Sequence, residues 1–263
     1  MNDSAGNQDF VRFAHRLADE AGAAILPHFR GAGEVSNKAD GSFDPVTEAD
    51  RGAEAAMRAL IEAAFPDHGI CGEEFPDKPA QGAFRWVLDP IDGTKAFIIG
   101  MPIWGTLIGL MRDGRPVIGM MDQPYLGERF WKAADGARFR SRHGEQLIHT
   151  RHCDSLADAI LGATTPDIFR DGELLRFRSL SGACRMTRFG GDCYLYCMLA
   201  MGLIDIVAEA HLKPFDIAPL VPIIEAAGGV VTTWDGGDPA NGGQILAVGD
   251  PALHAAAMQA LAR

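Results

Sequence analysis

Apolar residues recur every three to four positions in two N-terminal stretches of the chain. The first stretch, residues 9–29, has the spacing of an amphipathic helix, with Phe10, Phe13, Ala14, Leu17, Ala21, Ala24 and Ile25 on one face. The second, residues 53–65, repeats this pattern and stops before Pro66. We therefore predict two helices. Residues 31–45 between them have glycines, charges and no periodicity, which predicts an exposed loop or a short hairpin.

Beyond Pro66 the pattern changes to short apolar runs bounded by Gly, Pro and Asp, which are typical of strands. These runs lie at 69–71, 85–88, 105–111, 117–121 and 128–131. They predict a mostly antiparallel sheet. The longest uncharged run, 96–111, contains glycines and a proline and is shorter than the roughly 20 apolar residues that span a bilayer. We interpret it as strand and turn, and expect no membrane association.

From about residue 153 the pattern alternates between strand and helix. The predicted strands are 159–163, 185–187, 205–209, 229–233 and 245–248, and the predicted helices are 172–180, 193–201, 217–227 and a last one from Pro251. This alternation favours an α/β half, with Pro222 kinking its helix. The basic, turn-rich stretch 138–151 is the predicted boundary, so we expect an N-terminal α+β half over 1–150 and a C-terminal α/β half over 151–263.

Composition excludes several classes of function. The chain has 263 residues, 47% of them hydrophobic, so it can bury a sizeable core. Its formal net charge of −11 argues against a partner that is duplex nucleic acid or an anionic membrane. Five cysteines without a CxxC pair suggest neither a disulfide framework nor a zinc knuckle. With no signal-peptide pattern at the N-terminus, we expect a cytoplasmic protein.

The segment DPIDGT at residues 89–94 follows a predicted buried strand and carries two carboxylates three residues apart. Asp89 and Asp92 can converge on a hard cation, which prefers oxygen ligands. Gly93 and Thr94 supply backbone N–H groups where a phosphate can sit. The alternative interpretation is an acidic turn that caps a helix.

Three further acidic motifs stand at predicted strand or helix ends: TEAD at 47–50, GEE at 72–74 and PFD at 214–216. Each has an ordinary alternative, since Asp50 can begin a helix, Glu73 and Glu74 can form a solvated pair, and Asp216 is a good N-cap. Taken together with DPIDGT, they predict a shared metal site.

These motifs resemble those of the inositol monophosphatase family, which comprises magnesium-dependent, lithium-sensitive phosphomonoesterases. The residues concerned are VTEAD at 46–50, GEE at 72–74, DPIDGT at 89–94 and PFDIAP at 214–219. The resemblance implies a layered α-β-α-β-α fold, a homodimer, and hydrolysis by a metal-activated water without a phosphoenzyme.

The resemblance also implies a ligand set for two to three Mg²⁺ ions. Glu73, Asp89 and the carbonyl of Ile91 would hold the first ion, while Asp89, Asp92 and Asp216 would hold the second. A third, weaker ion would lie near Glu73. The clustering agrees with electrostatics, because neighbouring carboxylates and a phosphate ester need positive counter-charge to remain ionised together.

The remaining chemical roles follow from the same resemblance. Asp50 and Thr94 would orient and deprotonate the attacking water. Glu73 would be the third catalytic residue. The N–H groups of Gly93 and Thr94 would hold the phosphate. Lys38 resembles a loop lysine near the site, although its interval to Asp50 is one residue longer than in the animal inositol enzymes.

Within the family, this sequence resembles a subset of bacterial histidinol-phosphatases more closely than the inositol enzymes. The resemblance lies in residues 100–110, 122–124, 127–130 and 188–194. L-Histidinol phosphate carries an ammonium group and an imidazole, whereas inositol is neutral, so extra pocket carboxylates favour the former. Asp192 and Glu209 are the expected substrate contacts, against the alternatives of an N-cap and a solvated glutamate. Trp104 can stack on the imidazole or belong to the core.

We therefore expect a magnesium-dependent phosphomonoesterase that hydrolyses L-histidinol phosphate in histidine biosynthesis. An inositol-1-phosphate phosphatase is the nearest alternative. A non-catalytic protein that binds metal or phosphometabolites is the alternative of another class, and Asp50 and Thr94 argue against it because a binder needs no residues to position water.

Overall fold

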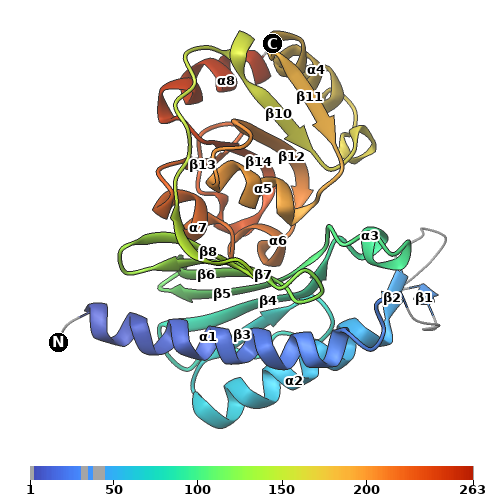
Figure 1. Cartoon of the computed structure of the whole chain (residues 1–263), viewed down its shortest axis with the longest axis vertical. Helices are drawn as coiled ribbons and strands as arrows, with labels where there is room; N and C mark the ends of the chain where they lie inside the picture. Colours follow the sequence, from blue (N-terminus) through green and yellow to red (C-terminus); the bar gives the residue numbers. More distant parts are fainter. Residues whose placement is uncertain (1–2, 31–34, 38–44, 263) are drawn as a thin grey trace.

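The structure, a computed structural model, describes residues 3–30, 35–37 and 45–262. Helices α1 (Asp3–Ile25) and α2 (Glu48–Ala64) lie side by side on one face of a seven-stranded sheet (Figure 1). Both predicted helices are confirmed. Strands β1 (Val35–Asn37) and β2 (Pro45–Thr47) pair antiparallel, so the hairpin alternative applies there. Lys38 lies outside the described residues.

The seven-stranded sheet has the order β3-β4-β5-β6-β7-β8-β9. Its strands are β3 (Gly69–Gly72), β4 (Phe84–Asp92), β5 (Gly105–Arg112), β6 (Arg115–Gln123), β7 (Glu128–Ala133), β8 (Gly136–Ser141) and β9 (Gly144–Ile148). Strand β3 runs parallel to β4 and every later pair is antiparallel, as predicted. Most of the basic stretch 138–151, the predicted boundary, forms strands β8 and β9, whose charged and exposed residues lie between buried Ala137 and Ile148. The last strand of the first sheet ends at Ile148 and the second sheet begins at Ile160, and the division into halves 1–150 and 151–263 stays a prediction.

The second sheet has the order β11-β10-β12-β14-β13. Its strands are β10 (Ile160–Ala163), β11 (Met186–Phe189), β12 (Ile206–Leu212), β13 (Val230–Thr233) and β14 (Gly243–Val248). The predicted alternation of strands and helices is confirmed. The sheet is mixed, because β10 runs parallel to β11 and β12 whereas β14 runs antiparallel to β12 and β13.

Helices separate and cover the two sheets. Between the sheets lie α5 (Cys193–Ala200), α6 (Pro214–Ile217) and α7 (Val221–Ala226), and on the far side of the second sheet lie α4 (Glu173–Ala183) and α8 (His254–Leu261) (Figure 1). Short elements complete the fold: α3 (Thr94–Ile98), η1 (Leu156–Asp158), η2 (Pro166–Ile168), η3 (Pro239–Asn241) and η4 (Pro251–Leu253). The expected kink at Pro222 is wrong, because this proline stands in the first turn of α7, where its missing N–H is not needed.

Three apolar layers hold these elements together, and they produce the layered α-β-α-β-α arrangement. One fills the space between α1, α2 and the first sheet, the second lies between the two sheets, and the third lies between the second sheet and helices α4 and α8. None of the helices in the described part of the chain is both long and apolar enough to cross a membrane.

Candidate active site

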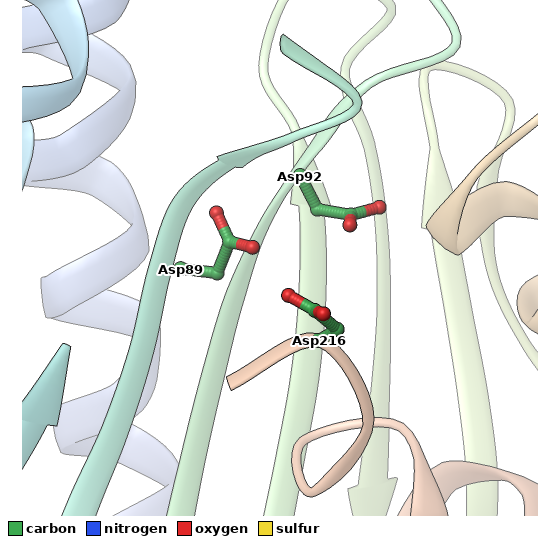
Figure 2. A group of neighbouring side chains, drawn as sticks. All are labelled: Asp89, Asp92 and Asp216. Atoms are coloured by element: carbon green, nitrogen blue, oxygen red, sulfur yellow. The ribbon is translucent and has the colours of Figure 1, made fainter. Parts of the chain in front are cut away.

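Three aspartates converge where the two sheets meet. Asp89 and Asp92 end β4, Asp216 lies in α6, and one carboxylate oxygen from each is within 4.8 Å of the others (Figure 2). Residues three apart in a regular strand point to opposite faces. The pairing of β4 with β5 shifts register between Asp89 and Asp92, and this irregularity allows both side chains to point toward Asp216.

Asp216 is fixed by its own helix. Its Oδ2 accepts a hydrogen bond of 2.6 Å from the backbone N–H of Lys213, the residue that precedes α6. Asp216 therefore stands at the third helical position and not at the N-cap, which was the alternative that the sequence left open. This hydrogen bond holds the carboxylate beside the β4 aspartates.

Burial sets the electrostatics of the cluster. Asp89 is only 2% exposed, and burial raises its pKa well above the ordinary range, with Glu73, Asp92 and Asp216 adding to the effect. Burial also raises the pKa of Asp92, helped by Asp192 and Asp216. Burial raises the pKa of Asp216 to about 7. These carboxylates need a counter-charge to ionise together.

The cluster fits a hard divalent cation. Asp89 Oδ1 is buried and has no hydrogen-bond partner among the described residues, so no donor satisfies the lone pairs of this oxygen. Carboxylate oxygens are the ligands that such cations prefer. The residues present are therefore suited to hold a metal ion.

The other expected catalytic residues surround Asp89. Asp50, 2% exposed, lies in the first turn of α2, and half-buried Glu73 follows β3. Both are among the charges that raise the pKa of Asp89, so the fold brings them to the cluster. The carbonyl of buried Ile91 accepts a 3.1 Å hydrogen bond from Thr94 Oγ1.

Gly93 permits a close approach that no other residue would allow. Its φ of 87° lies in the left-handed region, and a Cβ built on it would lie 3.1 Å from Asp192 Oδ2 and 3.2 Å from the Cα of Trp104. The DPIDGT turn is thereby packed directly against Asp192, a residue about a hundred positions later in the chain.

Glu54 has a supporting role that the sequence analysis missed. This fully buried carboxylate on α2 accepts 2.7 Å hydrogen bonds from Arg58 Nε and from the backbone N–H of Glu74. A Cβ on Gly72 would lie 2.1 Å from Glu54 Oε1, so the first residue of GEE must be glycine. A glutamate next to the apolar positions of a predicted amphipathic helix was the signal that could have revealed it.

A cavity of about 120 Å³ adjoins the aspartate cluster. It is lined by Asp92, Thr164, Ile168, Asp192, Cys193, Tyr196, Glu209, Leu212 and Asp216. Both expected substrate contacts, Asp192 and Glu209, therefore share one cavity with two members of the cluster.

The structure does not support the alternative interpretations, in which the Asp192 side chain caps a helix and Glu209 is solvated. Asp192 precedes α5 but its side chain caps no helix N–H. Glu209 is 2% exposed and not solvated, and it accepts hydrogen bonds of 2.7 Å from the Thr164 N–H and 2.9 Å from the Tyr196 hydroxyl. Burial raises the pKa of both carboxyls, and the nearby Thr164 hydroxyl, as a hydrogen-bond donor, opposes that rise.

Trp104 is a core residue, which contradicts the prediction that it stacks on a substrate imidazole. Its side chain is fully buried and packs against Phe29 and Phe97, with ring centroids 5.3 and 5.1 Å away. It does not line the cavity. A tryptophan in an apolar run has the same sequence pattern in either role, which is why the sequence left both open.

Comparisons with known proteins place this site in context. A sequence model of the inositol monophosphatase family matches residues 7–263. A chloroplastic bifunctional phosphatase of Arabidopsis thaliana is 40% identical over 96% of this chain and 75% of its own, and a histidinol-phosphatase of Streptomyces coelicolor is 38% identical over 87% of this chain and 88% of its own. The structure of an inositol monophosphatase from Zymomonas mobilis superposes with a TM-score of 0.86 at 44% identity, covering 97% of this chain and 98% of that one.

Proposed function

The chain belongs to the inositol monophosphatase family, and from that premise we propose that it hydrolyses L-histidinol phosphate to L-histidinol and phosphate, as a step of histidine biosynthesis. One observation carries the choice of substrate. The two acidic side chains Asp192 and Glu209 face one cavity that opens beside the aspartate cluster.

The aspartate cluster would hold the metal of this family, and we propose Mg²⁺, with two to three ions. Glu73, Asp89 and the Ile91 carbonyl would bind the first, Asp89, Asp92 and Asp216 the second, and a weaker third would lie near Glu73. Bound Mg²⁺ supplies Lewis-acid polarisation of the phosphoryl group and stabilises the leaving alkoxide. Its positive charge would also allow the aspartates to ionise together.

Thr94 and Asp50 would handle the attacking water. The Thr94 hydroxyl donates its proton to the Ile91 carbonyl, so its oxygen is left to accept a hydrogen bond from water. The buried carboxylate of Asp50 would take the water's proton. The backbone N–H groups of Gly93 and Thr94 would hold the phosphate oxygens.

The distance between the phosphate turn and Asp192 favours a substrate with a cation close to its phosphate. Asp192 Oδ2 lies 3.1 Å from the Cβ position of Gly93, so the acidic side chain and the turn are neighbours. In L-histidinol phosphate the ammonium stands on the carbon next to the esterified one. A neutral polyol phosphate would place no positive charge against Asp192 and Glu209.

Inositol 1-phosphate is the second candidate, because the Zymomonas mobilis protein that is 44% identical is described as an inositol monophosphatase. The test is phosphate release by the purified protein with Mg²⁺, using L-histidinol phosphate, inositol 1-phosphate and a nucleoside monophosphate side by side with an EDTA control. We expect the histidinol ester to be hydrolysed fastest and EDTA to abolish release. Faster release from inositol 1-phosphate would overturn the substrate assignment, and no release from any ester would favour a binding protein.

Assembly and location are proposals of the same kind. Exposed Ile99, Met101, Tyr125 and Leu126 lie around Arg30, whose guanidinium donates to the Gly100 carbonyl and the Tyr125 hydroxyl. An apolar patch of this sort supports a homodimer. Light scattering of the purified protein would measure its mass, and the mass of a monomer would contradict the dimer.

The five free cysteines support a reducing, cytoplasmic setting.

A further inference from the structure

Thr164 lies between the two carboxylates of the cavity. It directly follows β10, and its backbone N–H donates to Glu209 Oε1 over 2.7 Å. Its hydroxyl opposes the rise in the pKa of both Asp192 and Glu209, so it lies close to each of these carboxyls. Thr164 lines the cavity itself. A single residue therefore touches both acidic groups at the place where a substrate would enter.

The backbone at Asp192 is strained, which indicates that contacts from other segments stabilise this residue. Asp192 has φ 43° and ψ −130°, and it follows Gly190 at φ 88° and Gly191 at φ 129°. Two glycines adopt such angles freely, but an aspartate is strained there. A strained residue persists only where surrounding contacts over-determine it, and Thr164 supplies one of those contacts.

Glu209 is fixed by a second donor on the opposite side. The Tyr196 hydroxyl donates to Glu209 Oε2, while the Thr164 N–H occupies Oε1. Because each oxygen has a partner from the protein, the carboxylate cannot rotate without breaking a hydrogen bond. Its remaining lone pairs have a fixed direction.

Lys95 is one cation whose charge acts on Asp192, and the Thr164 N–H and the Tyr196 hydroxyl donate to Glu209, but these donors are still fewer than the lone pairs of the two carboxylates. A threonine hydroxyl has one proton, and ionised carboxylates only accept. Thr164 can therefore satisfy Asp192 or Glu209 with its hydroxyl, but not both at once. A ligand group with several N–H donors and a positive charge supplies what is missing, and an ammonium has three donors.

We propose that Thr164 is a positioning residue that sets substrate specificity, by holding Asp192 and Glu209 in the arrangement that receives the ammonium group of the substrate. This inference rests on the proposed function. It assigns the selectivity of the cavity to three residues acting together, of which the uncharged one orients the other two. Thr164 itself does not take part in bond cleavage.

The test compares two variants of Thr164. Thr164→Val keeps the shape of the side chain and removes the hydroxyl, whereas Thr164→Ser keeps the hydroxyl and removes the methyl group. We expect Thr164→Val to lower kcat/KM for L-histidinol phosphate by about 10- to 100-fold, the size of a lost hydrogen bond to a charged group. We expect kcat/KM for inositol 1-phosphate to change by less than about threefold, because that ester has no cation to place. Thr164→Ser should recover the preference. Thr165→Val, one residue further and outside the cavity, removes the hydroxyl that accepts from the Asp167 N–H at the start of η2, so it is the control for loss of a neighbouring hydroxyl and should keep the preference for L-histidinol phosphate.

A binding measurement separates positioning from damage to the fold. L-Histidinol has the ammonium but no phosphate, so it should inhibit hydrolysis of inositol 1-phosphate competitively in the wild type and more weakly in Thr164→Val. An equal loss on both esters would mean that the valine disturbs the whole site and would overturn the inference, as would an unchanged preference. If Thr164→Val does not fold, Thr164→Ala replaces it under the same criteria. A wild type that prefers inositol 1-phosphate would instead refute the proposed function, so the two failures are distinguishable.

Discussion

The backbone N–H of Cys193 donates to Asp92 Oδ2 over 2.7 Å. This bond joins the first residue of α5, a helix between the two sheets, to the end of β4 in the first sheet. Asp192, which precedes Cys193, is thereby tied to the aspartate cluster. The position of the proposed substrate contact and the position of the proposed metal ligand are consequently parts of one arrangement.

Asp92→Asn should remove most turnover and leave the fold intact. The asparagine Oδ1 can still accept from the Cys193 N–H, so the start of α5 keeps its anchor. The neutral amide is a much weaker metal ligand, and we expect kcat/KM to fall by more than the roughly 10- to 100-fold that loss of an outer partner costs. Steady-state phosphate release measures this. Circular dichroism and thermal melting provide the control, and near-normal activity would mean that Asp92 is not a ligand.

Magnesium should stabilise the protein against heat. Ionised carboxylates repel one another in the metal-free cluster, and an ion that binds only the folded state stabilises it by about 2.7 kcal/mol at 100 times its Kd. For a chain of this size that corresponds to a rise in Tm on the order of 5–10 °C. Differential scanning fluorimetry with Mg²⁺, with EDTA, and with NaCl at equal ionic strength measures the effect. Equal melting in all three solutions would contradict the metal site.

The metal-free protein should lose stability as the pH rises through the range in which Asp216 ionises. Burial raises the pKa of Asp216 from its ordinary value of 3.8 to about 7 in the folded state. Between these values the folded protein holds a proton that the unfolded chain has released, so this contribution to stability is complete below about pH 4 and is lost by about pH 7.

Asp216→Asn removes that titration and isolates its effect from other groups. In EDTA, the Tm of the wild type relative to Asp216→Asn should fall between about pH 5 and pH 7 and level off above. Excess Mg²⁺ should weaken this dependence, because the ion favours the ionised carboxylate. A Tm difference that does not vary with pH would show that Asp216 is ionised throughout.

Glu54→Gln should weaken metal binding without touching a ligand. Glu54 anchors the GEE segment through the Glu74 N–H and compensates the charge of Arg58. Glutamine has one acceptor oxygen where glutamate has two, so it cannot accept from both Arg58 Nε and the Glu74 N–H, and its NH2 group must face one of these donors. The replacement therefore loosens the segment that carries Glu73 and removes the charge that compensates Arg58. We expect the Mg²⁺ concentration for half-maximal activity to rise by about 10- to 100-fold, as for other outer partners of metal ligands. Exposed Glu62 lies on the same helix, and Glu62→Gln is the matched control that should leave the metal requirement unchanged.

Trp104→Phe should leave the substrate preference unchanged. The indole is fully buried between Phe29 and Phe97, and its Nε1 has no hydrogen-bond partner among the described residues. The ratio of kcat/KM for the two esters measures the preference. A selective loss on L-histidinol phosphate would restore the stacking role for this residue.

Periodicity and punctuation predicted most of the fold. We could predict helices α1 and α2 and strands β3 to β7, because each has the spacing of apolar residues that suits its own backbone geometry. Strands β8 and β9 were missed because they carry charged residues, among them Arg138 and Arg140 of β8, that resemble a linker. Pro222 was placed inside one helix because sequence spacing does not show where a chain turns between two short helices.

The acidic motifs of the site were recognisable because each stands at the end of an element. Asp89 and Asp92 follow an apolar run, and Asp216 follows a proline that begins a helix. Thr164, Tyr196 and Glu54 were not recognisable, since their importance depends on partners 13 to 45 residues away that only the fold brings together. Local sequence therefore indicates which residues carry chemistry, and tertiary packing determines which residues orient them.

The most direct test of the account is a competition between the two esters in one solution. Wild-type protein with Mg²⁺ is given equal concentrations of L-histidinol phosphate and inositol 1-phosphate, and phosphorus NMR follows both ester signals and the phosphate that appears. We predict that the L-histidinol phosphate signal disappears first. The inositol 1-phosphate signal should remain until the L-histidinol phosphate is nearly consumed. Loss of the inositol 1-phosphate signal first, or loss of both signals together, would contradict a cavity that selects for positive charge.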